Sequence, residues 1–232
     1  MSERQLSTVD EAAPRRAGAF FDMDNTLLSA SSGRLYLRYL REIGYVSWHK
    51  WVYISAQTLG YFLGLTDFPR LMSRLMQHTV GTGADEAWRL SRDWFDTMLR
   101  HYIAPGAAER IDWHRERGHH VAIVSAATQF AVQPVAQAFG LHKAYLATQL
   151  EIVDGRFTGR IIEPACYGAG KVLLAGEYAQ AHGLDLGECY FYSDSHHDLP
   201  LLEAVGHPVA VNPNTRLRRA AERRRWPVMY FY

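Results

Sequence analysis

Segments with helical periodicity alternate with short apolar runs from residue 107 to residue 232. The runs His120–Val124, Cys189–Ser193 and Pro208–Val211 contain β-branched and aromatic residues, which predicts strands. Asp154-Gly155 predicts the turn of a hairpin within residues 153–157. The spacing of apolar residues predicts helices over Ala107–Arg117, Gln129–Phe139, Lys171–His182, Leu199–Val205 and Asn214–Arg225. Strands that alternate with helices indicate an α/β fold with a Rossmann-like parallel sheet.

Residues 32–104 interrupt this alternation, because they hold helical stripes and no convincing strand. Thr82 and Asp85 match a capping box for the last of these helices, and Pro69 suits the first turn of an earlier one. We therefore expect an α/β core formed by residues 17–31 and 105–232, with an all-helical cap, residues 32–104, inserted after the first strand. Such an insert can close over a site as a lid or form only an additional packing layer.

The composition favours a folded, soluble protein in a reducing compartment. Hydrophobic residues make up 48% of the 232 positions and charged residues 21%, which supports a sizeable core. The net charge of +1 provides no field that would attract nucleic acid or acidic membranes. Cys166 and Cys189 match no metal or disulfide spacing. The polar residues 1–16 predict a loose tail without a signal peptide. We expect a cytoplasmic location, and the oligomeric state is not readable.

Two carboxylates, Asp22 and Asp24, follow directly after the apolar run Ala19–Phe21. If this run is a strand, both side chains leave its carboxyl end on the same side, because side chains alternate along a strand. Two like charges so close together need a cation or a shared proton. The pair therefore indicates a metal-assisted reaction rather than a structural role.

The other predicted strands end in side chains that suit the same chemistry. Ser125 follows one strand, and Asp194 follows another, with Asp198 four residues later. Lys171 begins a predicted helix after the glycine-rich stretch 168–170. In an open parallel sheet, ligands bind beyond the carboxyl ends of the strands. A hydroxyl, an ammonium and backbone N–H groups suit a phosphate, and clustered carboxylates suit Mg²⁺.

These residues resemble the four motifs of the haloacid dehalogenase superfamily, in order and at fitting intervals. The motifs are Asp22-x-Asp24-x-Thr26, Ser125, Lys171 and the stretch from Asp194 to Asp198. A helical insert between the first two motifs is similar to the phosphoserine phosphatase-like branch, the subfamily IB hydrolases. Residues 192–203 further resemble bacterial histidinol-phosphate phosphatases of that branch. The resemblance covers residues 17–230.

The resemblance implies roles for individual residues. Asp22 is expected to attack phosphorus and form an aspartyl-phosphate, while Asp24 acts as general acid and then general base. Mg²⁺ is expected to bind Asp22, Asp194 and the backbone carbonyl of Asp24, with Asp198 reached through water or orienting Lys171. The phosphate is expected to contact the backbone of Met23 and the residues Thr26, Ser125, Ala126 and Lys171.

The sequence departs from the phosphoserine-specific pattern at two positions. Ser31, beside Ser32, stands where such enzymes usually carry a glutamate that holds the substrate ammonium. His197 stands where asparagine is common in that branch, before the last motif aspartate. We therefore expect a Mg²⁺-dependent hydrolase of a small phosphate monoester, with histidinol phosphate as the first candidate substrate and phosphoserine as the second.

Other readings of single features stay open at this point. Ser125 could instead cap a helix that begins near Thr128. His196 and His197 could bind zinc, although no third histidine has a suitable spacing. The apolar-aromatic stretch Trp51–Leu65 falls short of the ~20 apolar residues that span a bilayer. The aromatic segment Trp48–Leu65 could lie at a membrane surface and admit a lipid phosphate. Transfer of the phosphoryl group to a second substrate is a further alternative.

The last predicted helix ends in a group of arginines, which we interpret as a solvated face (Arg216, Arg218, Arg219, Arg223, Arg224, Arg225).

Overall fold

The computed structural model describes residues 17–62, 68–77 and 79–232. The expected tail, residues 1–16, and the end of the aromatic segment, residues 63–65, lie outside this part of the chain. Among the described residues, no helix combines the length and the apolar character that crossing a membrane requires.

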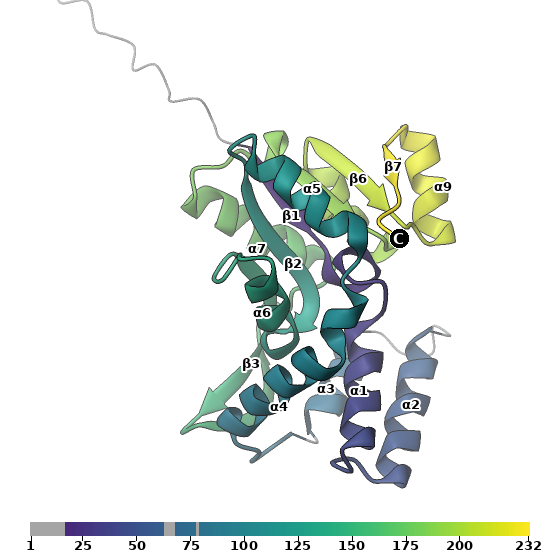
Figure 1. Ribbon diagram of the computed structural model, residues 1–232, viewed down its shortest axis with the longest axis vertical. Coiled ribbons are helices and arrows are strands. Elements are labelled where there is room, and N and C mark those ends of the chain that lie inside the picture. Colours follow the sequence, from purple (N-terminus) through teal and green to yellow (C-terminus); the bar gives the residue numbers. More distant parts are fainter. Residues whose placement is uncertain (1–16, 63–67, 78) are drawn as a thin grey trace, which may run out of the picture.

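A seven-stranded sheet in the order β4-β3-β2-β1-β5-β6-β7 forms the centre of the α/β fold (Figure 1). Every neighbouring pair is parallel except β3 and β4, which form an antiparallel hairpin at one edge. Its strands are β1 (Gly18–Phe21), β2 (His120–Thr128), β3 (Tyr145–Val153), β4 (Arg156–Ile162), β5 (Tyr190–Ser193), β6 (His207–Val211) and β7 (Val228–Met229).

Helices cover both faces of this sheet, because successive residues of the central strands are apolar on both sides. Phe20 and Phe191 pack with helices α7 (Ala169–Ala181), α8 (Leu199–Ala204) and α9 (Thr215–Arg224). Phe21 and Tyr192 point the other way and pack with α5 (Pro105–Arg115) and α6 (Gln129–Ala138). Strands that are buried on both faces read as continuous apolar runs, which is why β1 and β5 were recognisable in the sequence.

The described residues between β1 and α5 are mainly helical and lie beyond one end of the sheet (Figure 1). It contains α1 (Ser32–Glu42), α2 (Trp48–Phe62), α3 (Phe68–Gln77), α4 (Ala84–Thr97) and the short helix η2 (Leu99–Tyr102). The two chain segments that join it to the core pair with each other at Leu28 and Ile103. Hydrogen bonds from Ser29 N to Tyr102 O at 2.7 Å and from Ala104 N to Leu27 O at 2.9 Å hold this junction. An all-helical module inserted after the first strand is therefore present, and its division from the core at residues 32 and 104 remains a prediction.

The capping box at Thr82 and Asp85 was wrong. Helix α4 begins one residue later, with Gly83 as its N-cap and no side-chain cap. The helix starts later because tertiary contacts with the β3–β4 hairpin hold Thr82 and Gly83 in an extended conformation. Gly83 pairs with Arg156, and Phe157 N donates to Thr82 O at 3.1 Å. Pro69, by contrast, does lie in the first turn of α3.

The predicted elements of the core are present with shifted bounds. The hairpin turn at Asp154-Gly155 is confirmed, with φ of 50° and 73° at the two residues, which suits the Asp-Gly pair. The hairpin strands are much longer than residues 153–157, and β7 was not predicted. Strand β2 continues through Ser125 to Thr128, so the alternative reading of Ser125 as a helix cap was wrong: Thr128 is the N-cap of α6.

Candidate active site

The loop after β1 presents Asp22 and Asp24 at the carboxyl end of the sheet. Asp22 N donates to Tyr192 O at 2.8 Å, which continues the pairing of β1 with β5 up to the first acid. The side chain of Asp24 accepts a hydrogen bond from Ser32 N at 3.0 Å. Asn25, inside the short irregular helical segment Met23–Leu27, has a positive φ of 52°. The backbone of Asp22 therefore continues the sheet, while the side chain of Asp24 is held by the start of α1.

Lys171 joins the first motif to the last. Its Nζ donates to Asp22 Oδ1 at 2.8 Å and to Asp198 Oδ2 at 2.8 Å, and all three residues are buried. Ser193 Oγ also donates to Asp198 Oδ2, at 2.7 Å. Burial lowers the pKa of Lys171, but the charges of Asp198 and Asp22 more than offset this and hold the pKa above its ordinary value. The lysine is therefore a fixed cation beside Asp22.

Backbone geometry at the start of α7 places this lysine. Gly168 has φ of 52°, and the helix begins at the next residue. Gly170 packs so tightly that a Cβ there would lie 1.9 Å from the carbonyl oxygen of Ala165. Only glycine fits such an approach. The glycine-rich stretch thus brings Lys171 against the sheet.

Asp194, directly after β5, shares the negative environment of the two loop acids. Burial raises its pKa to about 8, and the charges of Asp22 and Asp198 add to the effect. Burial also raises the pKa of Asp22 to about 7 despite the nearby lysine, and it raises the pKa of Asp24, against which hydrogen bonds from Ser32 and Ser31 act. Carboxyls whose charged forms are disfavoured in this way are stabilised by a bound cation or by protons.

The described residues hold no group of three His, Cys, Asp or Glu side chains arranged to bind a metal. The set expected from the sequence is of another kind, since it uses the carboxylates of Asp22 and Asp194 and a backbone carbonyl of Asp24. All of these donors are oxygens, which is the chemistry that Mg²⁺ prefers, and Mg²⁺ commonly keeps several water ligands. The donor set therefore fits the expected ion.

The expected phosphate-binding residues divide into two groups. Ser125, Ala126 and Lys171 line the same cavity as the acids, and Ser125 Oγ accepts a hydrogen bond from Ala127 N at 3.2 Å. Thr26 is completely buried, its Oγ1 has no hydrogen-bond partner, and neither Thr26 nor Met23 lines the cavity. The side chain of Met23 belongs to the hydrophobic core. Direct contacts of Thr26 and Met23 with phosphate stay predictions.

The two histidines of the last motif bind neighbouring polar side chains. His197 Nδ1 lies 2.8 Å from the Tyr167 hydroxyl, and His196 Nε2 lies 3.2 Å from Arg216 Nη1. Both residues line the cavity beside Asp194. Within the described residues these contacts do not form a histidine metal site.

Sequence reasoning missed several residues that hold the loop and the acids of the candidate site. Asn212 Nδ2 donates to Asn25 O at 3.2 Å, and the Tyr232 hydroxyl donates to the same oxygen at 3.3 Å. Ser193 was overlooked as well, although its place directly before Asp194 at a strand end was a usable signal. Asn212 and Tyr232 carried no such signal, because their contacts depend on the path of β6 and the chain end.

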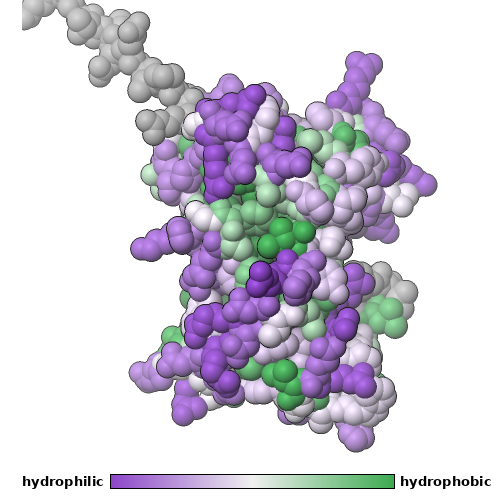
Figure 2. Space-filling model, in the orientation of Figure 1, coloured by the Kyte–Doolittle hydropathy of each residue, from purple (hydrophilic) through white to green (hydrophobic). Residues whose placement is uncertain are grey.

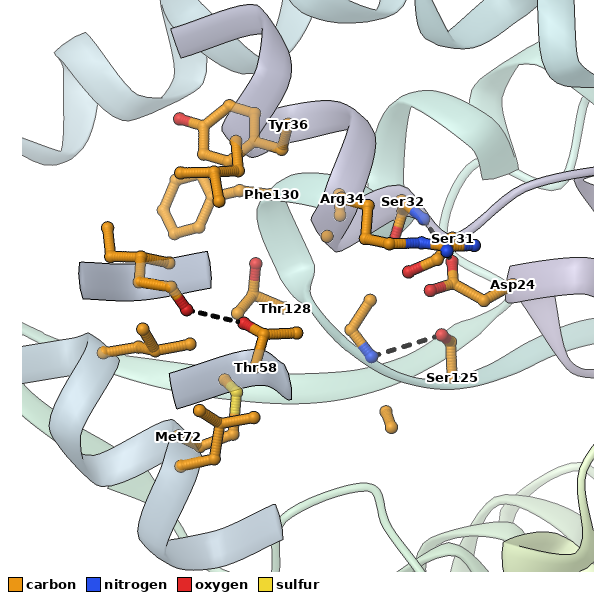
Figure 3. A pocket seen from close by; sticks show the side chains of 18 of the residues that line it. Asp24, Ser31, Ser32, Arg34, Tyr36, Thr58, Met72, Ser125, Thr128 and Phe130 are labelled. Carbon is orange, nitrogen blue, oxygen red and sulfur yellow. Dashed lines mark hydrogen bonds between the residues drawn. The ribbon is translucent and has the colours of Figure 1, made fainter. Parts of the chain in front are cut away.

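A single cavity of about 1910 Å³ runs from these acids into the space between the helical insert and the sheet. In Figure 3, Asp24, Ser31, Ser32, Arg34 and Ser125 gather at one end, and Tyr36, Thr58, Met72 and Phe130 surround the other. Arg34 lines this cavity. Arg74 does not, and it donates to Gln57 Oε1 at 2.8 Å instead.

Comparisons with known proteins agree with this geometry. The model of the haloacid dehalogenase-like hydrolase family matches residues 19–203. A probable phosphatase of Mycobacterium tuberculosis is 35% identical over 94% of this chain and 77% of its own length. A second protein of that organism, named phosphoserine phosphatase, is 33% identical over 93% of this chain and 71% of its own. A histidinol-phosphatase of Neisseria meningitidis is 30% identical over 92% of this chain and 98% of its own.

Solved structures share the fold. A Bordetella pertussis protein of unknown function superimposes with a TM-score of 0.87 at 30% identity, over 94% of this chain and 100% of that one. A phosphoserine phosphatase, solved as a phospho-aspartyl intermediate analogue, superimposes with a TM-score of 0.67 at 17% identity, over 94% of both chains. With the family match over most of its length, the chain belongs to the haloacid dehalogenase-like hydrolase family, and it is a phosphatase of the α/β fold described above.

Proposed function

We propose that this protein is a Mg²⁺-dependent phosphomonoester hydrolase that works through an aspartyl-phosphate on Asp22. The observation that carries the proposal is the buried contact of Lys171 with both Asp22 and Asp198, at the floor of a cavity that Asp24, Ser125 and Asp194 also line. Phosphoryl transfer depends mainly on positioning and on stabilising dispersed negative charge. A nucleophilic carboxylate beside a fixed cation supplies both.

The two loop acids suit different steps. The hydrogen bond from Lys171 to Asp22 Oδ1 fixes the orientation of the nucleophile for attack on phosphorus. Asp24 is held by Ser32 N, and burial raises its pKa, which favours the protonated form that a general acid needs. In our scheme, Asp24 protonates the leaving alkoxide and then takes a proton from the water that hydrolyses the aspartyl-phosphate.

Residues around the acids provide the rest of the site. Asp22, Asp194 and the carbonyl of Asp24 would hold Mg²⁺, and Asp198 would orient Lys171. When bound, the ion offsets the repulsion among the acids and the charge on the phosphoryl oxygens. The backbone of Met23 and Ala126, the hydroxyls of Thr26 and Ser125 and the ammonium of Lys171 would bind the phosphoryl group.

The substrate is proposed to be a small phosphorylated metabolite. The names of two relatives, histidinol-phosphatase and phosphoserine phosphatase, support histidinol phosphate as the first ester to test and phosphoserine as the second. We place the enzyme in the cytoplasm, with no nucleic-acid partner.

A lipid phosphate at a membrane surface is a second candidate. Helix α2 exposes Trp48, Val52 and Leu59, whose spacing puts them on one side of the helix. On the face shown in Figure 2, hydrophobic residues form separate patches among hydrophilic ones. Sedimentation with anionic vesicles tests this candidate, and absence of binding excludes the interfacial location.

Phosphate release from a panel of esters tests the proposed function. The panel compares histidinol phosphate, phosphoserine, a sugar phosphate and a lipid phosphate by kcat/KM, with Mg²⁺ and with a chelator. Free phosphate that appears only with Mg²⁺ supports hydrolysis. A phosphorylated second substrate in place of free phosphate would show a phosphotransferase.

A further inference from the structure

The cavity extends far beyond the catalytic acids. Its volume of about 1910 Å³ exceeds the ~300–1,000 Å³ that is usual for small-ligand pockets. The same continuous space is bounded by Asp22 and Lys171 at one end and by residues of α3 and of the β3–β4 hairpin at the other, among them Leu75 and Phe157. Only part of this space is needed to hold a phosphate at Asp22, so the remainder is available to the leaving group.

The part away from the acids has apolar walls contributed by several elements. Helices α1 to α3 supply Leu40, Ile54 and Met72, and α6 and β3 supply Phe130 and Leu150 on the opposite side. Figure 3 shows Tyr36, Met72 and Phe130 around this end, separated from the polar group at Asp24 and Ser125. A leaving group that enters this space exchanges water for apolar contacts, which favours an apolar group.

Three of the hydroxyls in these walls already donate to backbone carbonyls of the walls themselves. Thr58 Oγ1 donates to Ile54 O at 2.9 Å, Thr79 Oγ1 donates to Met76 O at 2.7 Å, and Ser91 Oγ donates to Phe130 O. Because each hydrogen is used by a backbone carbonyl, these groups offer no donor to a ligand. These three hydroxyls therefore do not indicate a polar leaving group.

Charges that line the cavity also disfavour an ammonium in the leaving group. Of the described residues, the only carboxylates in the lining are Asp22, Asp24, Asp194 and Asp198, all in the catalytic cluster. The described part of the helical insert contributes the cationic residues Arg34, Arg38 and Lys50 to the lining, and no carboxylate. Both histidinol phosphate and phosphoserine carry an ammonium, which needs an opposite charge when it leaves water.

We propose that the leaving group of this enzyme is an apolar, chain-like alcohol, and that the space between the insert and the β3–β4 hairpin binds its chain. The inference rests on the proposed phosphatase activity and narrows its substrate class. It ranks a phosphate monoester of such an alcohol above the two amino-alcohol phosphates that the relatives' names suggest.

A series of soluble alkyl phosphates tests the inference without a membrane. We compare kcat/KM for butyl, hexyl and octyl phosphate, histidinol phosphate and phosphoserine, by free phosphate release with Mg²⁺. The expected result is a rise of roughly three- to fourfold for each added methylene, and octyl phosphate as the best substrate of the set. A kcat/KM that does not rise with chain length, or a higher value for either amino-alcohol phosphate, overturns the inference and leaves the proposed hydrolysis standing. No phosphate from any ester, butyl phosphate included, contradicts the proposed function itself.

A charge placed in the apolar part of the cavity checks where the chain binds. Met72→Asp is expected to lower kcat/KM for octyl phosphate at least about tenfold more than kcat/KM for butyl phosphate. The matched control is Leu173→Asp, at an exposed apolar position of α7 outside the cavity, which is expected to change neither value. An equal loss for both esters in a folded Met72→Asp protein overturns the assignment, and the wild-type series decides the question if that variant does not fold.

Discussion

The ammonium of Lys171 lies 2.8 Å from the carboxylate of Asp22, although 149 positions separate the two residues in the sequence. Both side chains are buried, and the same ammonium binds Asp198. A buried cation between two carboxylates fixes all three in place, because moving any one of them leaves an unpaired charge out of water. We therefore expect the proposed active site and the stability of the core to be coupled through Lys171.

Lys171→Met is expected to lower the free energy of unfolding by about 3–5 kcal/mol, since it leaves Asp22 and Asp198 buried without their cation. Urea unfolding in the absence of divalent ions measures this loss. The control is Arg38→Met, which removes the exposed ion pair with Glu42 and is expected to cost about 0–1 kcal/mol. Similar losses in the two variants would contradict the coupling.

Gly170→Ala is expected to reduce kcat by about a hundredfold, because a Cβ at this position collides with the Ala165 carbonyl and displaces Lys171. Gly176→Ala, on the same helix, is the matched control. Its Cβ would meet nothing within 4 Å, so activity is expected to stay and helix propensity to rise. Steady-state kinetics and a thermal melt of both variants check this, and full activity in Gly170→Ala would show that the close approach is not needed.

His114 is expected to make stability depend on pH. The ring is fully buried, with Nε2 at 2.8 Å from the Tyr192 hydroxyl and Nδ1 at 2.8 Å from His119 Nδ1. Burial, together with the charge of Arg110, lowers the pKa of His114 from 6.5 to about 3. Between these two pKa values the unfolded chain binds a proton at His114 and the folded protein does not. The contribution of neutral His114 to the free energy of unfolding is therefore complete above pH 6.5 and is lost as the pH falls toward 3.

Urea unfolding at pH 7 and pH 5 measures this effect. The wild-type protein is expected to lose up to about 2 kcal/mol more than His114→Gln between these two pH values. His142→Gln, at an exposed position, is expected to behave like the wild type. The same pH dependence in His114→Gln as in the wild type would assign the effect to other groups.

Ser31→Glu is expected to shift specificity toward substrates with an ammonium. Ser31 lines the cavity beside Asp24, where a carboxylate would face the leaving group. The ratio of kcat/KM for histidinol phosphate to that for butyl phosphate is expected to rise at least about tenfold. Ser31→Gln, which has a similar size and no charge, serves as the control, and an equal shift there would show that charge is not the cause.

The sequence was sufficient to predict most of the core, because its central strands are buried on both faces and its helices have clear apolar periodicity. Most of strand β3 was missed, since only its last residue, Val153, lies in the predicted hairpin. On one side β3 pairs with β2, where the register shifts between Ser125 and Thr128, and on the other side it pairs antiparallel with β4. No continuous apolar run in the sequence marks this strand. The two-residue strand β7 depends on its register with β6, which no local pattern encodes.

In the candidate site, too, residues marked by a local sequence pattern could be predicted, and residues placed by long-range contacts could not. Asp22, Asp24, Asp194 and Lys171 were recognisable, because each stands at the end of an apolar strand or after a glycine-rich turn. Asn212 and Tyr232, which hold the carbonyl of Asn25, were not, since their contacts join residues about two hundred positions apart. The size and walls of the cavity also came only from the structure, because helices of the insert and the β3–β4 hairpin form it together.

Detection of a phosphoryl group on Asp22 tests the central claim most directly. Rapid acid quenching during turnover of a phosphate monoester with Mg²⁺, followed by mass spectrometry of the peptides, locates a trapped acyl-phosphate. The account predicts one added phosphoryl group on the peptide that contains Asp22, and none in Asp22→Asn, which should also lose at least about a thousandfold in kcat. Phosphate on another residue, or full turnover by Asp22→Asn, would contradict it.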